Sequence, residues 1–402
     1  MTPKPALPPA PVPRPLHIVM VLPTYLPESF GGAEQQSRKL CEALEQLGVD
    51  VTVLAPRLLA ATPVRESRGR TTIERLRVRR APNLGGRHMA SFLLWSLKLG
   101  WWLYTERRRY DVIHVIHGRL HAVPAAVAGR LLGKPILVKL GRGGAHFDLK
   151  IVREKRLGGP FFSRLLTDLS TAFVANSREI ADDLQAIGIA DSRIHRLPNG
   201  VEVPPAASRS RVPRFGGAPV RFLYFGRLDP EKALDRMIRG FAALGAGTRA
   251  RLTIVGEGAC GAQLRTLARD LGLDGRVVFL PPVTDVGRLL LDADFHVSTS
   301  LSEGMSNALL EAMSWGTPPI ASRVSGVDDI ITGGVSGLVF EPGDDAGYVA
   351  ALTTAMALTP AEWTAMSQAA ADTARSRFAI DVVAERHVDL YSRLMLVGEA
   401  VA

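Results

Sequence analysis

The sequence predicts an α/β protein of two domains, and three observations support this prediction. The chain has 402 residues, enough for two domains that each have a core of their own. Near-continuous apolar runs alternate with glycine-containing loops and helical patterns, which is typical of buried parallel strands joined by helices. Residues 204–219, PPAASRSRVPRFGGAP, read as a linker between two such series.

The composition is that of a globular protein without a disulfide framework. Hydrophobic residues make up 47% of the chain and charged residues 22%, as in a globular protein. The two cysteines, Cys41 and Cys260, lie far apart, so neither a disulfide framework nor a metal cluster is indicated, and a reducing cytoplasmic compartment fits best. Residues 1–15 contain seven prolines and no apolar signal-peptide core, so we expect a disordered leader there.

The net charge of +10 is unevenly distributed, since residues 1–203 carry +13 and residues 204–402 carry −3. A basic first half favours an acidic acceptor, an anionic membrane surface or nucleic acid, and a generally arginine-rich composition explains it equally well. The most hydrophobic stretch, Met89 to Tyr104, is short for a membrane span. Arginines precede and follow it, a pattern that can bind an anionic bilayer. The sequence favours the alternative of a core helix beside an arginine-rich surface loop at 65–87, because apolar residues occur nearly all round the helix.

The first domain begins with a strand, Leu16 to Leu22, then a glycine loop, a helix from about Ala33 to Leu47 and a second strand at 49–54. A ligand should meet such a βαβ unit at the carboxyl end of the first strand. Gly31 and Gly32 in that loop would let a phosphate or sugar approach the backbone, although a plain turn is the commoner meaning of a Gly-Gly pair. Further strands are expected at 111–116 and 136–140.

Polar residues follow several of these strands. His117 stands at the end of the strand at 111–116, where it is either a functional group or a polar loop residue without a role in the reaction. The loop GRGGAHFD follows the strand at 136–140 and offers His146 and Asp148 as candidate acceptor contacts. Pro198 to Gly200 is a turn by its chemistry.

The second domain begins with a strand at 220–225, and Arg227 and Lys232 follow it closely. Two fixed cations there could offset the charge that develops on a leaving phosphate. More strands are expected at 252–255, 277–280, 295–300, 320–322 and 337–340, with a final helix from about 382 to 396.

The stretch EGMSNALLE, Glu303 to Glu311, reads as a loop followed by a helix. Ser306 or Asn307 can cap this helix, and Gly316 ends it. A helix that starts at the carboxyl end of a strand presents free N–H groups and a positive dipole end, which suits a phosphate. Carboxylates accept hydrogen bonds from sugar hydroxyls, so the two glutamates and the amides between them predict a nucleotide-sugar site. The alternative is a capped helix with two solvated glutamates.

These motifs, in this order, resemble the family 4 glycosyltransferases, which are retaining enzymes of the GT-B fold. The family signature is the Glu303–Glu311 pair followed by Ala-Met and Gly-x-Pro, here residues 312–313 and 316–318. Gly31-Gly32 with Glu34, Asn199-Gly200, and Arg227 with Lys232 match further family landmarks. The resemblance covers roughly residues 16–396.

The resemblance implies an α/β protein of GT-B architecture, with two doubly wound Rossmann-like domains that face a central cleft. Residues 16–203 would form the acceptor domain, joined by a C-terminal helix at about 382–402, and residues 204–381 the nucleotide-sugar donor domain. The reaction implied is transfer of a sugar, with retention, from a UDP- or GDP-sugar to a glycan, lipid-linked or small-molecule acceptor in cell-envelope polysaccharide or glycoconjugate synthesis.

The resemblance also assigns roles to residues. Glu303 and the amides that follow it would hold the sugar, Glu311 the ribose hydroxyls, and Arg227 with Lys232 the leaving diphosphate. Family members usually carry a His-x-His motif after the strand at 111–116, but Ile116 stands at the second histidine position here. His117 or His121 would then take its role near the anomeric carbon, and we assign His117. The donor-binding residues implied are Gly31, Gly32, Gly304, Met305, Ser306, Asn307 and Glu311.

No metal-ligand spacing such as Asp-x-Asp occurs in a convincing loop, so we expect no metal and no cofactor besides the donor substrate. We expect no nucleic acid partner and a cytoplasmic location, with peripheral association at the inner face of the plasma membrane left open. A dehydrogenase is disfavoured, because no G-x-G-x-x-G follows the first strand. Two alternatives remain: a nucleotide-sugar 2-epimerase of similar fold, and a non-catalytic protein that binds sugar nucleotides or membrane surfaces.

Overall fold

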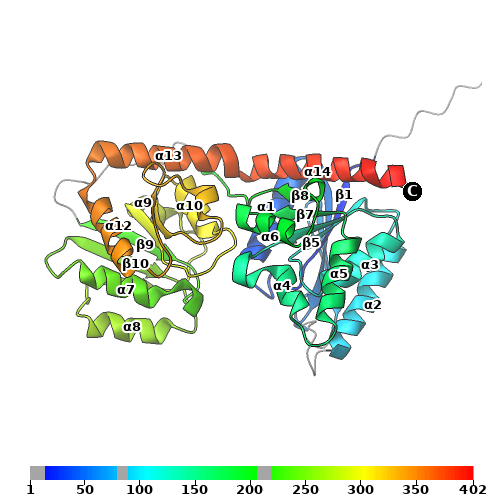
Figure 1. Cartoon of the computed structure of the whole chain (residues 1–402), viewed down its shortest axis with the longest axis horizontal. Coiled ribbons are helices and arrows are strands. Elements are labelled where there is room, and N and C mark those ends of the chain that lie inside the picture. The colour runs from blue at the N-terminus through cyan, green and yellow to red at the C-terminus, as the bar shows by residue number, and fades with distance from the viewer. Residues whose placement is uncertain (1–13, 79–88, 206–218, 402) are drawn as a thin grey trace, which may run out of the picture.

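The computed structural model describes residues 14–78, 89–205 and 219–401, and it contains two α/β units side by side (Figure 1). The leader expected at 1–15 and the linker expected at 204–219 lie almost wholly outside the described residues.

The first unit is built on an eight-stranded sheet in the order β3-β4-β2-β1-β5-β6-β7-β8. Neighbouring strands are parallel except for β3 and β4, which pair antiparallel at one edge. The strands are β1 (His17–Val21), β2 (Asp50–Arg57), β3 (Arg65–Arg68), β4 (Thr71–Arg77), β5 (Val112–Ile116), β6 (Ile136–Leu140), β7 (Ala172–Ala175) and β8 (Ile194–Arg196).

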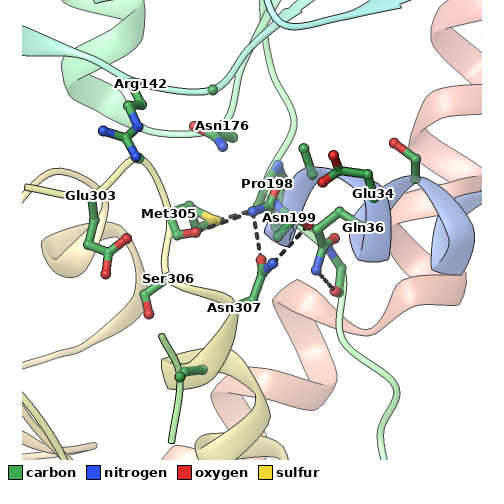
Figure 2. A pocket seen from close by; sticks show the side chains of 18 of the residues that line it. Glu34, Gln36, Arg142, Asn176, Pro198, Asn199, Glu303, Met305, Ser306 and Asn307 are labelled. Atoms are coloured by element: carbon green, nitrogen blue, oxygen red, sulfur yellow. Dashed lines mark hydrogen bonds between the residues drawn. The ribbon is translucent and has the colours of Figure 1, made fainter. Parts of the chain in front are cut away.

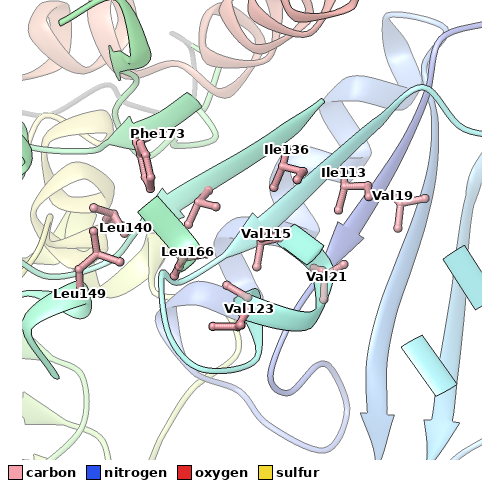
Figure 3. Packing of buried hydrophobic residues seen from close by; sticks show 14 of the residues in the cluster. Val19, Val21, Ile113, Val115, Val123, Ile136, Leu140, Leu149, Leu166 and Phe173 are labelled. Carbon is pink, nitrogen blue, oxygen red and sulfur yellow. The ribbon is translucent and has the colours of Figure 1, made fainter. Parts of the chain in front are cut away.

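Helices cover both faces of this sheet, which explains why its central strands are apolar at nearly every position. On one face, alternate strand residues such as Val19, Val115 and Ile136 pack against α2 (Met89–Thr105), α3 (Ala122–Leu131) and α5 (Gly159–Leu169) (Figure 3). On the other face, the intervening residues pack against α1 (Gly32–Gln46) and α14 (Ile380–Val401). Two shorter helices, α4 (Asp148–Arg153) and α6 (Arg178–Ala186), follow β6 and β7.

The second unit has a six-stranded parallel sheet in the order β11-β10-β9-β12-β13-β14. Its strands are β9 (Val220–Phe225), β10 (Ala250–Val255), β11 (Val277–Leu280), β12 (Phe295–Ser298), β13 (Pro319–Ser322) and β14 (Leu338–Phe340). Its helices are α7 (Leu234–Ala243), α8 (Gly261–Asp270), α9 (Gly287–Asp292), α10 (Asn307–Ser314), α11 (Val327–Ile330), α12 (Asp345–Ala357) and α13 (Pro360–Phe378).

Both sheets are doubly wound, so the predicted fold class is confirmed. Strand order reverses between β1 and β5 in the first sheet and between β9 and β12 in the second. Ligands bind such sheets outside the carboxyl ends of the strands at the point of reversal. We therefore expect the ligand site at the loops after these four strands.

The chain crosses between the two units twice, and the crossings lie against each other. The Val201 amide donates to the Phe378 carbonyl at 2.7 Å, and the Ile380 amide donates to the Val201 carbonyl at 2.9 Å. From this point α14 runs back over the first unit, while α13 stays on the second (Figure 1). The paired crossings form a narrow connection about which the two units could rotate.

The arginine-rich segment that the sequence analysis treats as a surface loop differs in the structure. Residues 65–77 form β3 and β4 at the edge of the first sheet, so that expectation is wrong for this part. Arg75 is fully buried in β4, where its guanidinium donates to the Leu26 carbonyl at 2.6 Å and to Glu66 Oε2 at 3.0 Å. These bonds stabilise the buried guanidinium, whose Nε has no hydrogen-bond partner among the described residues. Residues 79–88 lie outside the described part of the chain.

The expected core helix is α2, and it is buried on one side only. Trp95, Leu99 and Leu103 are completely covered, whereas 73% of Leu97 and 69% of Trp101 remain exposed. Apolar residues all round a helix therefore do not mean burial all round it. Within the described residues, no helix combines the length and apolarity that a membrane crossing requires.

Candidate active site

A cavity of about 390 Å³ lies where the carboxyl ends of the two sheets face each other (Figure 2). The loops after β1, β5 and β6 line it from one unit, and the loops after β9 and β12 line it from the other. It brings together the predicted residues Gly32, His117, Arg227, Lys232, Glu303, Gly304, Met305, Ser306 and Asn307. Gly31 and Glu311 do not line it.

Lys232 and Glu303 form a close ion pair on the wall that belongs to the second unit. Lys232 Nζ lies 2.5 Å from Glu303 Oε1, and Ser300 Oγ donates to the same oxygen at 3.0 Å. Only 15% and 17% of the two charged side chains remain exposed. Ala233, directly after Lys232, has a φ of 47°, a left-handed conformation that costs a non-glycine residue energy and occurs often at functional sites.

Arg227 is also paired with carboxylates. It contacts Asp229, and its Nη2 lies 2.9 Å from Glu231 Oε1. Glu231 in turn accepts two hydrogen bonds from Arg142 of the first unit, at 3.2 and 3.3 Å. Burial raises the pKa of Glu231, but the cations Arg142, Lys232 and Arg227 outweigh it, and the pKa is lowered overall. Both predicted diphosphate-binding cations are thus neutralised by carboxylates, which the sequence analysis did not foresee.

The helix after β12 begins and ends as the sequence predicts. Ser306 is the N-cap of α10, and its Oγ accepts from the Leu309 amide at 3.5 Å. Gly316 ends the helix in the left-handed conformation. Gly304 lies so close to the first unit that a Cβ atom there would be 1.8 Å from the Gly141 carbonyl oxygen. The start of α10 therefore faces the cavity next to the loop after β6.

Three amide side chains form hydrogen bonds beside the cavity (Figure 2), Asn199 and Asn307 between the two units and Gln36 within the first unit. Asn199 Nδ2 donates to Asn307 Oδ1 at 2.9 Å, and Asn307 Nδ2 donates to the Gly32 carbonyl at 3.2 Å. Gln36 Nε2 donates to the Gly200 carbonyl at 2.9 Å and its Oε1 accepts from the Gly200 amide at 3.0 Å. The sequence shows Asn199 only as a turn residue, because its partners lie far away along the chain.

Of the three histidines considered for the reaction centre, His117 is the one that lines the cavity. It adopts a left-handed φ of 69° and remains 26% exposed. His121 is buried, and its Nε2 donates to the Ile116 carbonyl at 2.8 Å. His114 is buried on the opposite face of β5 and contacts the Tyr391 hydroxyl at 2.8 Å. His117 is thus the one of the three that faces the cavity, and its role near the anomeric carbon stays a prediction.

Asp148, expected as a candidate acceptor contact, holds the loops together instead. Its carboxylate is completely buried and accepts from Arg119 Nε at 2.9 Å and from the Gly141 amide at 2.8 Å. His117 Nδ1 lies 3.5 Å away. Burial raises the pKa of Asp148, but His117, Arg119 and the Gly141 amide outweigh it and lower the pKa to about 2. Asp148 is thus an ionised group close to the imidazole, and His117 Nδ1 forms no hydrogen bond with any described residue. His146 is exposed and lines a separate hollow.

Glu311 and Gly31 lie just outside the cavity. Burial raises the pKa of Glu311, and Glu202 and Asp285 raise it further, while Lys39 lowers it. Gly31 is the N-cap of α1, and a Cβ atom there would be 2.5 Å from a carboxylate oxygen of Glu34. The roles assigned to both residues remain predictions.

Further polar residues that the sequence did not single out as functional also line the cavity, among them Lys139, Arg142, Asn176 and His387. Arg142 lies in the GRGG loop, which the sequence analysis considered only for its glycines. A charged residue in a loop expected to face the ligand was the signal that could have identified it. Among the described residues, no group of three or more His, Cys, Asp or Glu side chains is placed to hold a metal ion.

Comparison with known proteins gives two family matches. Residues 31–200 match the glycosyl transferase 4-like domain, and residues 219–357 match the glycosyl transferases group 1. The N-acetyl-alpha-D-glucosaminyl L-malate synthase of Bacillus anthracis is 24% identical over 252 residues, 60% of this chain and 64% of that protein. The D-inositol 3-phosphate glycosyltransferase of Acidothermus cellulolyticus is 31% identical over 270 residues, 60% of this chain and 59% of that protein. The match thus spans less than two thirds of either relative.

Solved structures share the fold. The Anabaena protein Alr3699/HepE, solved with UDP, superimposes with a TM-score of 0.73 at 18% identity, over 94% of this chain and 100% of that chain. The sucrose-phosphate synthase of Thermosynechococcus elongatus gives a TM-score of 0.73 at 19% identity, over 95% of this chain and 100% of that chain. The two family matches fall on the two units that the structure describes, one on each side of the cavity. The chain therefore belongs to the glycosyltransferases of group 1 with a 4-like N-terminal domain, which have the GT-B fold.

Proposed function

We propose that this protein transfers a sugar, with retention at the anomeric carbon, from a nucleotide diphosphate sugar to a glycan, lipid-linked or small-molecule acceptor. The observation that carries the proposal is the convergence of Lys232, Glu303 and the start of α10 on one wall of the cavity, with His117 on the other. UDP bound to the Anabaena structure supports a uridine nucleotide, with guanosine as the alternative. We place the reaction in cell-envelope polysaccharide or glycoconjugate synthesis.

The charges on the second unit suit a departing diphosphate. Arg227 and Lys232 would hold its oxygens, and the free amides at the start of α10 would add fixed dipoles that require no reorganisation as charge develops. In the free protein Lys232 pairs with Glu303, and Arg227 pairs with Glu231. When the donor binds, each cation would exchange its carboxylate partner for a phosphate oxygen. Glu303 would then be released to accept hydrogen bonds from the sugar hydroxyls.

The carboxylates at the cavity support attack from the face that the diphosphate leaves. Among the described residues, the acidic side chains that line the cavity are Glu34, Glu231 and Glu303. Each already accepts a hydrogen bond, from Thr24, Arg142 and Lys232 respectively. Once the donor is bound, Glu303 would be occupied by the sugar hydroxyls and Glu231 would keep its bonds from Arg142, so neither would form a covalent intermediate. The leaving phosphate would then take the proton of the acceptor hydroxyl. His117, close to Asp148, would lie on the opposite side near the anomeric carbon.

The first unit would bind the acceptor, and we propose that the inner face of the plasma membrane is where it does so. Both cysteines are free, which suits a reducing compartment. Arg107, Arg108 and Arg109 follow the end of α2, and their combination with the exposed aromatic and apolar residues of the helix favours an anionic bilayer surface. Donor and acceptor would then meet between the two units.

Product analysis with a panel of UDP- and GDP-sugars tests this function. We expect Lys232→Met to reduce turnover by at least 100-fold, on the order of the loss when one transition-state donor is removed, while the circular dichroism spectrum stays native. Lys150→Met, on the exposed surface of α4, is the matched control and should leave turnover unchanged. An epimerised sugar nucleotide formed without acceptor would favour the 2-epimerase, and normal turnover by Lys232→Met would exclude the proposed site.

A further inference from the structure

A lysine without a charged partner lines the cavity on the wall of the first unit. Lys139 lies on β6, opposite Ile116 of β5 and Val174 of β7. Its side chain borders the cavity, and among the described residues none is placed to form a hydrogen bond or ion pair with its ammonium group. Arg227 and Lys232 on the other wall each contact a carboxylate, so Lys139 differs from them.

Two polar atoms near Lys139 also lack a partner. Asn176 follows β7 on the same face of the sheet as Lys139, and His387 of α14 covers that face. Both side chains line the cavity, and Asn176 Oδ1 and His387 Nε2 are buried without a hydrogen bond among the described residues. His387 Nδ1 donates to the Val383 carbonyl at 2.8 Å, so in the neutral ring Nε2 is an acceptor. We call these three side chains the Lys139 group.

Lys139 carries the only charge of the Lys139 group, and this charge is positive. Burial lowers the pKa of Lys139 to about 8, which leaves the ammonium mostly protonated at neutral pH. Burial lowers the pKa of His387 to about 3 and that of His114 well below its ordinary value, so both rings are neutral. Burial also raises the pKa of the Tyr391 hydroxyl, which stays neutral. The Lys139 group therefore carries a positive charge that no neighbouring carboxylate offsets.

A half-buried charge without a partner is unfavourable unless a ligand supplies one, and the two free acceptors beside it can accept hydrogen bonds from hydroxyl donors. We propose that Lys139 binds an anionic group, a phosphate or a carboxylate, on the acceptor substrate, and that Asn176 and His387 accept hydrogen bonds from its neighbouring hydroxyl groups. This inference rests on the proposed function and deepens it, because it identifies the acceptor as an acidic, hydroxyl-bearing molecule. The donor diphosphate has its own cations on the opposite wall.

Three probes with the same ring chemistry test the charge requirement: glucose 6-phosphate, glucuronate and glucose. Each is titrated into the full-length protein by thermal shift in saturating UDP at constant ionic strength. The wild type should be stabilised at concentrations at least tenfold lower by the anionic probe that fits than by glucose. The more effective of the two anionic probes distinguishes phosphate from carboxylate.

Two variants test the role of Lys139, and the thermal shift with UDP shows that each variant remains folded. Lys139→Met removes the charge at similar length, and Asn176→Asp keeps the size but supplies Lys139 with a carboxylate inside the protein. Both should lose the preference for the anionic probe while the thermal shift with UDP stays unchanged, and Lys150→Met should behave as the wild type. Equal responses of the wild type to all three probes, or a preference retained by Lys139→Met, would overturn the inference. Failure of UDP to bind the wild type would instead count against the proposed function.

Discussion

At the scale of single residues, the proposed role of Lys139 in binding the acceptor requires an ammonium group that lowers the free energy of unfolding of the free protein. Burial lowers its pKa from 10.5 to about 8, so between these pH values the unfolded chain binds more protons than the folded chain. The free energy of unfolding therefore increases with pH across this window, and below pH 8 the folded protein carries the full cost of a buried ammonium. His114, His387 and Tyr391, which surround it, are neutral at pH 7 and do not offset this cost.

We predict that Lys139→Met raises the free energy of unfolding by about 2 kcal/mol at pH 7, allowing for partial solvation of the site. The gain should shrink as the pH rises from 8 to 10, because the wild-type ammonium is then lost. Urea denaturation at pH 7 and at pH 10 measures both quantities. A variant less stable than the wild type at pH 7 would mean that the ammonium has a favourable partner in the free protein.

Single residues also show what the sequence could and could not predict of the site. Arg227, Lys232, Glu303 and Ser306 were found because each follows a buried strand at a fixed spacing, and the structure places all four at the cavity. Their ion pairing was not predicted, since it depends on side-chain positions that spacing does not reveal. The Lys139 group could not be found at all. Lys139 lies on β6, Asn176 follows β7 and His387 lies on α14 more than 200 residues further along the chain, so no local pattern shows that the three side chains meet.

At the scale of elements, strands covered on both faces were the most predictable. Residues 136–140 and 220–225 were predicted with the bounds that the structure gives, because mostly apolar runs leave little choice of boundary. β3 and β4 were missed because both carry charged residues: β3 is the edge strand, and the arginine of β4 at position 75 is buried against polar partners that lie far away along the chain. In α2, periodicity could not show which apolar side would be covered, because both sides are apolar.

The uncovered side of α2 leads to a prediction about membranes. Leu97→Glu combined with Trp101→Glu should reduce binding to vesicles containing phosphatidylglycerol by at least tenfold, because it places charge where apolar side chains would enter the interface. Binding of the wild type should weaken with salt, since the basic residues act through screened attraction. Vesicle sedimentation, with phosphatidylcholine vesicles as reference, measures both effects.

The matched control is Val335→Glu, because Val335 is 55% exposed in the second unit, away from α2. It should bind vesicles as the wild type does. If the α2 double variant also binds normally while remaining folded, the exposed apolar side has another purpose.

At the scale of the whole molecule, the site exists only because two units face each other across a narrow connection. Arg142 and Glu231 pair across the gap, and Asn199 and Asn307 do so beside it. The two chain crossings at Val201 meet on one side only. Exposed ion pairs contribute little each, so the closed arrangement depends mainly on close packing where the loops touch. The sequence predicted two domains and a cleft, but the contacts that set its width join residues from different motifs.

Gly304 is the place where this packing can be tested, since its backbone lies against the loop after β6. A Cβ atom at Gly304 would be 1.8 Å from the Gly141 carbonyl oxygen, well inside van der Waals contact, and backbone atoms cannot yield as a flexible side chain can. We predict that Gly304→Ala forces the two units apart without unfolding either, because each has its own core. Small-angle X-ray scattering should show a larger radius of gyration, and turnover should fall because the two walls no longer meet around the substrates.

Gly247→Ala is the control for this experiment, because Gly247 lies in the second unit with no atom within 4 Å of the added Cβ. It should leave both the scattering curve and turnover unchanged. UDP contacts mainly the second unit in the proposed function, so Gly304→Ala should weaken UDP binding less than it reduces turnover. An unchanged radius of gyration with normal turnover would show that the loops yield easily, and that the width of the cleft is set elsewhere, at the Val201 crossings or the Arg142–Glu231 pair.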